Sequence, residues 1–339
     1  MFARGCTTFF ILAALLATTV LAQQPPAKKV PPIPIPKVGV PPQKGVPTAK
    51  APVTPPTGPK TADLPEAKEV SLDTKDGMSI KAMFYPGTKK KEAVPLILVH
   101  GLDGSRGDFH QLAIDLQTMG HAVIVPDLRF HGKSKSQKRP DGVSVSLDPE
   151  KLNRPALEAM EFDIQACKKF LREKNNAGEL NIEQLCVVGA EYGAILAARW
   201  AADDWSLQQL PAYKQGQDVK ALVLLSPPAS VKAVTLREAM PRIPIGVSIL
   251  IIAGTTDSKS SSEAKKLHGQ LQLQHSKSDD KGLFLLQPET NLSGAKLLGD
   301  AVSLDGTKVR TMVLNFITKR LVERQAEFAW QERKDPLGN

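Results

Sequence analysis

Short runs of consecutive apolar residues alternate along the chain with longer stretches of helical periodicity. Runs that are apolar on both faces are typical of parallel strands buried under helices. Such runs occupy residues 95–99, 121–126, 185–188, 219–225, 247–253 and 282–287. Helical patterns occupy residues 108–119, 155–173, 194–200, 261–273 and 309–325. The alternation predicts right-handed parallel crossovers and an α/β fold, in which a mostly parallel twisted sheet carries helices on both faces.

The start of the folded part shows a different pattern. Residues 70–74 and 78–85 flank the tripeptide Lys75-Asp76-Gly77. An Asp-Gly turn between two apolar stretches is typical of a β-hairpin. We therefore expect a single folded domain over residues 69–339 that begins with this hairpin.

The residues before the hairpin have the composition of a leader and a linker. Arg4 is followed by an apolar run over residues 9–21, which predicts a secretory signal peptide over residues 1–22, cleaved before Gln23. An uncleaved membrane anchor is the alternative. Residues 23–68 are rich in Pro and Lys and lack aromatic residues, which predicts a disordered linker. We therefore expect a secreted or periplasmic protein.

The excess of basic residues is confined to that leader and linker. The chain has 44 Lys and Arg against 35 Asp and Glu, but Arg4 and six Lys precede the first acidic residue, Asp63. From Thr61 onward 37 basic residues accompany 35 acidic ones, so the folded part is nearly neutral and a nucleic-acid surface is not indicated. The linker's Lys residues could make weak contact with an anionic envelope surface. One hypothesis is therefore an envelope-associated structural protein that acts through its basic linker.

The run at residues 185–188 leads into Gly189-Ala190-Glu191-Tyr192-Gly193 and then into an Ala-rich helical pattern. This pattern predicts a buried strand, a sharp turn and a helix. The two Gly leave no Cβ where strand and helix pack closest, and the residue between them is raised at the edge of the sheet. The predicted turn has the geometry of a nucleophile elbow.

Two more motifs precede the elbow. Residues 95–99 end in His100-Gly101, and residues 121–126 end in Asp127-Leu128-Arg129-Phe130-His131-Gly132-Lys133-Ser134. In this order the three motifs resemble the third strand, fourth strand and nucleophile elbow of the α/β-hydrolase superfamily, including its serine hydrolases and lipase-like members. The resemblance covers residues 69–325 and implies the α/β-hydrolase fold. The segment between Pro227 and Gly246, where many hydrolases insert a lid domain, is short, so we expect little or no lid.

The resemblance also assigns the catalytic positions. Glu191 stands where the family has a nucleophile, normally Ser. Asp257 follows the strand at residues 247–253 at the position of the acid. Ser293 follows the last strand at the position of the catalytic His, and the chain has no His after His275. The triad of this chain is therefore degenerate.

Other positions of the expected site follow from the same motifs. The backbone N–H groups of Leu102 and Tyr192 are expected to form the oxyanion hole, because loop geometry alone places them. Four residues at the strand ends are expected to line the site: His100, Gly101, Arg129 and His131. For the two His, hydrogen bonds that support the loops are the expected role.

Without nucleophile and base, a Ser-type mechanism is not available. We expect a pseudoenzyme that serves as a binding or scaffold module, with the Glu191 carboxylate at a helix N-terminus as a built-in anion of the oxyanion hole. The alternative is an active carboxylic-ester hydrolase with other catalytic groups, such as His100 or His131 as base. A third arrangement makes Glu191 itself the nucleophile.

The remaining candidate groups indicate little further chemistry. Cys167 and Cys186 are the only Cys after the predicted leader, and two buried free thiols are expected, with a disulfide as the alternative. Asp257, without a His partner, is expected to cap the next helix. The sequence shows no glycine-rich nucleotide loop and no His/Cys cluster, so no cofactor and no metal are expected. It identifies neither the small-molecule or protein partner nor the oligomeric state.

Overall fold

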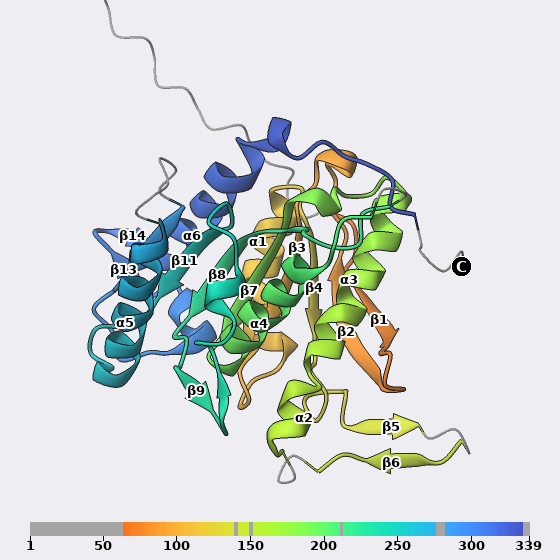
Figure 1. The fold of residues 1–339 in the computed structure, drawn as a ribbon, viewed down its shortest axis with the longest axis horizontal. Helices are drawn as coiled ribbons and strands as arrows, with labels where there is room; N and C mark the ends of the chain where they lie inside the picture. The colour runs from red at the N-terminus through yellow and green to blue at the C-terminus, as the bar shows by residue number, and fades with distance from the viewer. Residues whose placement is uncertain (1–63, 139–141, 149–151, 211–212, 276–281, 335–339) are drawn as a thin grey trace, which may run out of the picture. The chain divides into compact units, whose positions relative to one another are not determined.

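The computed structural model describes residues 64–138, 142–148, 152–210, 213–275 and 282–334. At its centre lies an eight-stranded sheet (Figure 1). In spatial order its strands are β1 (Lys68–Asp73), β2 (Ser79–Tyr85), β4 (Ala122–Pro126), β3 (Pro95–Val99), β7 (Leu185–Ala190), β8 (Val219–Leu225), β11 (Ser248–Ile252) and β12 (Leu283–Leu286). All pairs from β4 to β12 are parallel, and only β1–β2 and β2–β4 are antiparallel. The predicted α/β architecture is confirmed.

Helices and small hairpins connect the strands. The described α-helices are α1 (His110–Thr118), α2 (Arg154–Glu158), α3 (Glu161–Asn176), α4 (Tyr192–Ser206), α5 (Ser258–His275) and α6 (Val309–Ile317). The hairpins are β5–β6 (Ser136–Lys138, Ser144–Ser146), β9–β10 (Ser230–Val231, Val234–Thr235) and β13–β14 (Ser303–Leu304, Thr307–Lys308). Between β8 and β11, where a lid would be inserted, the chain forms only β9–β10 and a 3-10 turn, Met240–Arg242.

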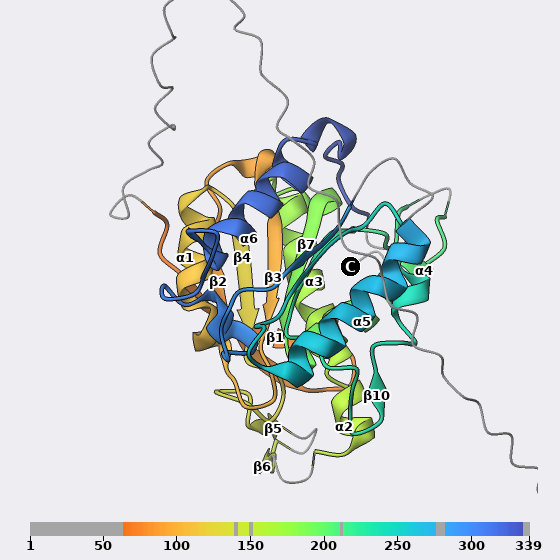
Figure 2. The same cartoon turned by 90° about the vertical axis from the view of Figure 1, so that its left-hand side faces the viewer.

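Both faces of the sheet are covered because alternate residues of each strand point to opposite sides. In β3, Leu96 and Leu98 belong to the apolar cluster under α1 and α6. Ile97 and Val99 belong to the cluster under the helices α2 to α5. Figure 2 shows α1 and α6 on one side of the sheet and α4 and α5 on the other. Every residue of β3 is buried, which accounts for its unbroken apolar sequence.

The sheet also separates the two thiols. Cys167 lies on α3 in the cluster on one face, and Cys186 lies on β7 in the cluster on the other. Both are buried and free, as expected from the sequence. Burial raises the pKa of each thiol, so both behave as small apolar side chains.

Two predicted helices differ from the structure. The pattern at residues 155–173 forms two helices, because hydrogen bonds from Met160, Phe162 and Asp163 to the third preceding residue interrupt the α-helical ladder. The pattern at residues 309–325 forms α6 only as far as Ile317, and Thr318–Val322 is a π-helical turn. In both cases the apolar periodicity continues across the interruption, so it gave no sign of the break.

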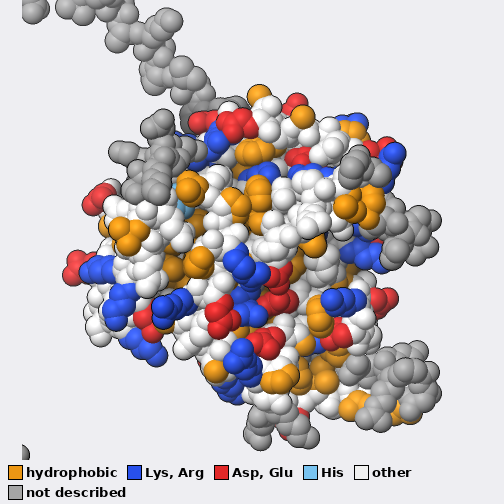
Figure 3. Space-filling view, in the orientation of Figure 1, with side chains coloured by type: hydrophobic (Ala, Val, Ile, Leu, Met, Phe, Trp, Pro, Cys, Tyr) orange, Lys and Arg blue, Asp and Glu red, His pale blue; other side chains and the backbone are white. Residues whose placement is uncertain are grey.

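The first strand, β1, begins at Lys68. The predicted domain start at residue 69 stays a prediction. The predicted signal peptide, residues 1–22, and residues 23–63 of the predicted linker lie outside the described residues. Across the part of the chain that is described, no helix has the length and apolar character to span a membrane. On the face seen in Figure 3, Lys and Arg side chains alternate with Asp and Glu, as the nearly neutral composition of this part requires.

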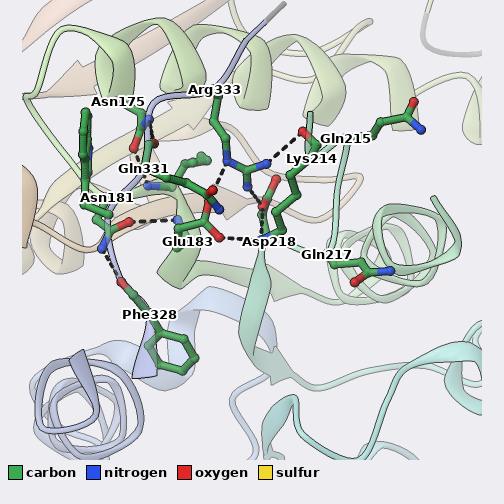
Figure 4. Close-up of polar contacts among 12 residues, drawn as sticks. Asn175, Asn181, Glu183, Lys214, Gln215, Gln217, Asp218, Phe328, Gln331 and Arg333 are labelled. Carbon is green, nitrogen blue, oxygen red and sulfur yellow. Dashed lines mark hydrogen bonds and ion pairs between the residues drawn. The ribbon is translucent and has the colours of Figure 1, made fainter. Parts of the chain in front are cut away.

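The chain after α6 crosses the edge of the sheet where β7 and β8 begin. Asn181 Nδ2 donates to Phe328 O at 2.7 Å, and Asn175 Nδ2 donates to Gln331 O at 3.0 Å (Figure 4). Trp330 Nε1 donates to Leu180 O at 3.1 Å. We call residues 328–333 the C-terminal strap. Its backbone carbonyls are satisfied by side chains far away in the sequence.

A buried ion network anchors the strap. Arg333, 3% exposed, pairs with Asp218 and, at 2.6 Å, with Glu183. Lys214 bridges the same two carboxylates (Figure 4). Lys168 pairs with Asp218 at 2.8 Å and also with Asp204. Three cations thus balance three carboxylates, and the network is neutral as a whole.

We predict that Arg333→Gln destabilises the fold by about 3 kcal/mol, because it leaves buried carboxylates without a compensating charge. Chemical denaturation at neutral pH measures the change. The matched control is Arg154→Gln, which removes an exposed pair with Glu158 and should cost under about 1 kcal/mol. Equal effects of the two substitutions would show that the strap does not stabilise the domain.

Two buried His residues should make stability depend on pH. Burial lowers the pKa of His100 to about 4, and burial together with the charge of Lys89 lowers that of His121 to about 3. As the pH falls, the unfolded chain therefore takes up protons at these two rings before the folded chain does. The contribution of the neutral rings to the free energy of unfolding is complete above about pH 6.5. It is lost as the pH falls toward the folded-state pKa values.

We predict that His121→Asn, which keeps an acceptor for the Val94 N–H, removes about 2 kcal/mol of the stability loss between pH 7 and pH 5. Denaturation series at both pH values give this difference. The same substitution at the partly exposed His268, whose pKa burial also lowers but less strongly, should reduce the pH dependence by a smaller amount. A wild-type slope in the His121 variant would mean that this ring is not neutral in the fold.

Candidate active site

The predicted strand, turn and helix at residues 185–200 are present as β7 and α4. Glu191 joins them with φ +52° and ψ −119°, a strained conformation for a residue with a Cβ. A Cβ on Gly189 would collide with the Gly193 carbonyl, and one on Gly193 with the Val99 carbonyl of β3. The Glu191 N–H donates to Leu225 O at 2.8 Å. The backbones of β7, α4 and β3 are therefore in direct contact, and Glu191 projects from the carboxyl edge of the sheet.

The Glu191 carboxylate is enclosed by two loops. A Cβ on Gly101, after β3, would lie 2.5 Å from Oε2, and one on Gly294 would lie 2.9 Å from Oε1. Ser293 Oγ donates to Glu191 Oε1 at 2.8 Å. Gly294 N donates to Ser226 Oγ at 3.0 Å and fixes the second loop above β8. The structure thus brings together residues that are 102 positions apart and for which the sequence analysis predicts the nucleophile and His positions.

The oxyanion-hole positions are only partly defined by the described contacts. Tyr192 is the first residue of α4, so its N–H has no partner within the helix. Leu102 follows Gly101 on the loop beside the carboxylate. None of the described hydrogen bonds joins the Glu191 carboxylate to either N–H. Occupation of the oxyanion hole by this carboxylate stays a prediction.

His100 supports the loop after β3 and is not available as a base. Its Nε2 accepts a hydrogen bond from Leu128 N at 3.0 Å, so its proton is on Nδ1, which donates to Gly101 O at 2.7 Å. The ring is fully buried, and burial lowers its pKa to about 4. Both nitrogens are thus occupied, and neither faces Glu191.

His131 and Arg129 also serve the scaffold. The His131 ring lies between Arg129 O at 2.9 Å and Leu102 O at 2.6 Å, edge-on to His100. The Arg129 guanidinium binds Asp163 and Asp76. The polar groups of His100, Arg129 and His131 bind within the loops, and none of the three borders the pocket described below. That they line a functional site stays a prediction. Gly101 does border this pocket.

Asp257 acts as a helix cap, as expected. Its Oδ1 accepts a hydrogen bond from Ser260 N at 3.2 Å at the start of α5. Thr256 N donates to Thr290 O at 3.1 Å, which places the loop after β11 beside the loop that carries Ser293. The described contacts do not join Asp257 to Ser293 or Glu191.

A pocket of about 670 Å³ opens over Glu191 and Ser293. This volume is in the range of small-molecule sites. Its walls come from the loop after β3 with α1, and from the 3-10 helix Gly294–Leu298 with α6. Its other charged residues were not expected from the sequence: Asp103, Asp108, Lys296, Asp300 and Arg310. Of these residues, only Asp103 could have been recognised from the sequence, because it lies within His-Gly-Leu-Asp-Gly directly after a predicted strand.

Several of these charges are already paired within the wall. Arg310 binds Asp115 at 2.7 Å and Asp300 at 2.8 Å. Asp108 Oδ2 accepts from Ser105 N at 3.2 Å in a capping box. The pocket therefore offers a polar surface, in part neutralised by the Arg310–Asp300 pair, with the Glu191–Ser293 pair in it. Among the described residues, no group of three or more His, Cys, Asp or Glu is arranged to hold a metal ion.

A family model described as the alpha/beta hydrolase fold matches residues 94–300. The chain belongs to this family. Among curated proteins, an uncharacterized protein of Mycobacterium tuberculosis is 24% identical over 164 residues, 48% of this chain and 47% of the relative. An sn-1-specific diacylglycerol lipase of Danio rerio is 36% identical over 72 residues, 21% of this chain and 22% of the lipase. The chain thus spans half or less of the curated relatives it matches.

Solved structures show the same fold. A dienelactone hydrolase of Anabaena variabilis is 16% identical with a TM-score of 0.51, over 80% of this chain and 100% of that one. An esterase of Pyrococcus furiosus is 16% identical with a TM-score of 0.51, over 75% of this chain and 90% of that one. At these identities the similarity concerns the fold alone.

We predict that Glu191→Ser combined with Ser293→His creates weak esterase activity. Either substitution alone should give little gain, since a Ser without a base and a His without a nucleophile are both inactive. The double variant should exceed the product of the single effects by about one to two orders of magnitude. Initial rates with short-chain p-nitrophenyl esters measure this.

The matched control is the double variant with Asp257→Asn, which removes the carboxylate expected to orient the new His. A folded double variant that shows the two side chains within hydrogen-bond distance in a crystal structure, yet remains inert, would mean that the oxyanion hole is not formed.

Proposed function

We propose that this α/β-hydrolase-fold protein binds a small polar molecule in the pocket over Glu191 and does not carry out Ser-type hydrolysis. The observation that carries the proposal is the 2.8 Å hydrogen bond from Ser293 Oγ to Glu191 Oε1. It brings a carboxylate and a hydroxyl into contact at the two positions where the family's nucleophile and His would meet.

The chemistry of this pair supports binding over catalysis. A nucleophilic hydroxyl requires a base that removes its proton, and an ordinary carboxylate is too weak a base for this at neutral pH. His100, the buried imidazole directly after β3, binds backbone groups with both ring nitrogens. The pocket retains the volume and polar wall of a ligand site without an activated nucleophile.

The similar proteins support the proposal of a ligand site in this fold, but they do not identify its ligand. They include an esterase, a dienelactone hydrolase and a lipase. The proposal is that this chain keeps the ligand site of such a fold at the carboxyl edge of the sheet. It also includes export by the leader at residues 1–22, and a spacer role for the basic linker at an anionic envelope surface.

A second candidate function is hydrolysis with exchanged roles. Ser293 Oγ borders the pocket and donates to a carboxylate, so Ser293 would be the nucleophile and Glu191 the proton acceptor. Gly294 N, the N–H that follows Ser293, donates to Ser226 Oγ and so is not free to stabilise an oxyanion. This is why we favour binding.

We predict that the purified protein hydrolyses short-chain p-nitrophenyl esters no faster than buffer and is not labelled by fluorophosphonates. Ester turnover that disappears in Ser293→Ala would support exchanged roles instead and refute the non-catalytic proposal. Turnover that disappears in His100→Asn would refute it equally and identify that ring as a base.

Binding is tested separately with a library of polar small molecules and thermal unfolding. Ala295 borders the pocket and is partly exposed, so Ala295→Trp should fill the pocket and abolish the stabilisation that library members give to the wild type. Equal stabilisation in both proteins would place the ligands elsewhere.

A further inference from the structure

The charges that border the pocket over Glu191 do not balance one another. Its charged lining consists of four carboxylates and two cations, which are Asp103, Asp108, Glu191, Asp300, Lys296 and Arg310. Every nitrogen of the Arg310 guanidinium donates a hydrogen bond within the wall, to Asp115, to Leu298 O and to Asp300. Asp300 and Arg310 therefore neutralise each other, and neither charge is left for a ligand.

The other three carboxylates have no cation beside them among the described residues. Glu191 Oε1 accepts a hydrogen bond from the uncharged Ser293 hydroxyl, and no described group donates to Oε2. Asp108 accepts from the backbone N–H of Ser105, and Asp103 has no partner in the described chain. Against these three negative charges the lining offers one unpaired positive charge, the exposed Lys296 ammonium.

The uncharged polar groups of the lining add acceptors. Gln111 Nε2 donates to Asp115 Oδ1 at 2.9 Å, and since a carboxylate can only accept, Gln111 Oε1 is left as an acceptor at the pocket. Ser293 Oγ uses its proton for Glu191, so its lone pairs are what it has left for a ligand. The pocket is thus rich in acceptors and negative charge, which suits a ligand that brings donors and positive charge.

Building on the function proposed above, we propose that the ligand of this pocket carries a primary ammonium group on a short carbon chain. An ammonium group supplies one positive charge and three N–H donors, which match the unpaired Glu191 oxygen and the acceptors beside it. Leu112, Ala295 and Leu298 in the same lining provide apolar contacts for the carbon chain. An anionic ligand such as a carboxylate would instead meet three charges of its own sign.

The size of the pocket favours an organic amine over a bare cation. At about 670 Å³ the pocket has room for a small molecule, whereas an ion would fill little of it. The described residues also hold no group of three or more His, Cys, Asp or Glu arranged for a metal ion. The three unpaired carboxylates are therefore better matched by ammonium groups than by a divalent metal.

Isothermal titration of the full chain at neutral pH and constant ionic strength tests the proposal with three probes of equal chain length. Cadaverine carries an ammonium group at each end, 1,5-pentanediol is neutral, and glutarate is a dianion. We expect cadaverine to bind the wild type at least about tenfold more tightly than either of the other two, because only its charged ends complement the carboxylates.

The test variant is Glu191→Gln, which removes the charge and keeps an acceptor for the Ser293 hydroxyl. The matched control is Glu173→Gln, which removes an exposed carboxylate from α3 on the opposite face of the sheet. We expect cadaverine to bind the control like the wild type and the test variant at least about tenfold more weakly.

Cadaverine that fails to bind the wild type, binds it no better than the diol, or binds Glu191→Gln equally well would overturn this ligand class. The proposed function would survive that result if polar library members still stabilise the wild type and lose this effect in Ala295→Trp. If neither the probes nor the library bind, both proposals fail.

Thermal unfolding without ligand checks that Glu191→Gln is folded. Should it unfold, Asp103→Asn replaces it, because Asp103 is exposed and its carboxylate has no partner among the described residues, so its loss leaves the fold intact. We expect a severalfold loss of cadaverine affinity in Asp103→Asn, and an unchanged affinity would count against the proposal.

Discussion

The direct contact of three backbones at the elbow determines the architecture of the candidate site. Gly189 and Gly193 allow β7, α4 and β3 to meet without intervening side chains. The residue between them must then adopt positive φ and project from the sheet, a strain of about 1–3 kcal/mol that the surrounding hydrogen bonds maintain. Position 191 is therefore presented in the same way whatever its side chain. A Glu in this place alters the chemistry of the site while the scaffold stays unchanged.

The surrounding loops adapt to the carboxylate. Gly101 and Gly294 leave room on two sides of it, and Ser293 supplies a hydrogen bond to one oxygen of this partly buried carboxylate. His100 and His131 form hydrogen bonds to backbone carbonyls within the loops. Glu191, Ser293, His100 and His131 thus each have a hydrogen-bond partner, and they lie next to a pocket that remains open.

The sheet and the elbow were predictable from the sequence because they depend on local pattern. Unbroken apolar runs mark strands that are buried on both faces, and Gly-x-x-x-Gly marks the sharp turn at Glu191. The interruption before α3 was not predictable, since the helical pattern continues through Met160. Nor was the charged wall of the pocket, because residues such as Arg310 and Asp108 meet only after the chain has folded. The C-terminal strap has no periodicity, and its partners lie far away in the sequence.

The strap also has a consequence for how the domain is made. Arg333 lies 115 residues after Asp218 and 157 after Asn176, so every partner is synthesised before it. Contacts of such large sequence separation form late, because a long loop must close first. During translation the carboxylates before β7 and β8 are made before the strap that covers them, so this edge of the sheet stays open until residues 328–333 are added. The strap thus closes the sheet at the edge opposite the pocket only after the strands that it covers have been made.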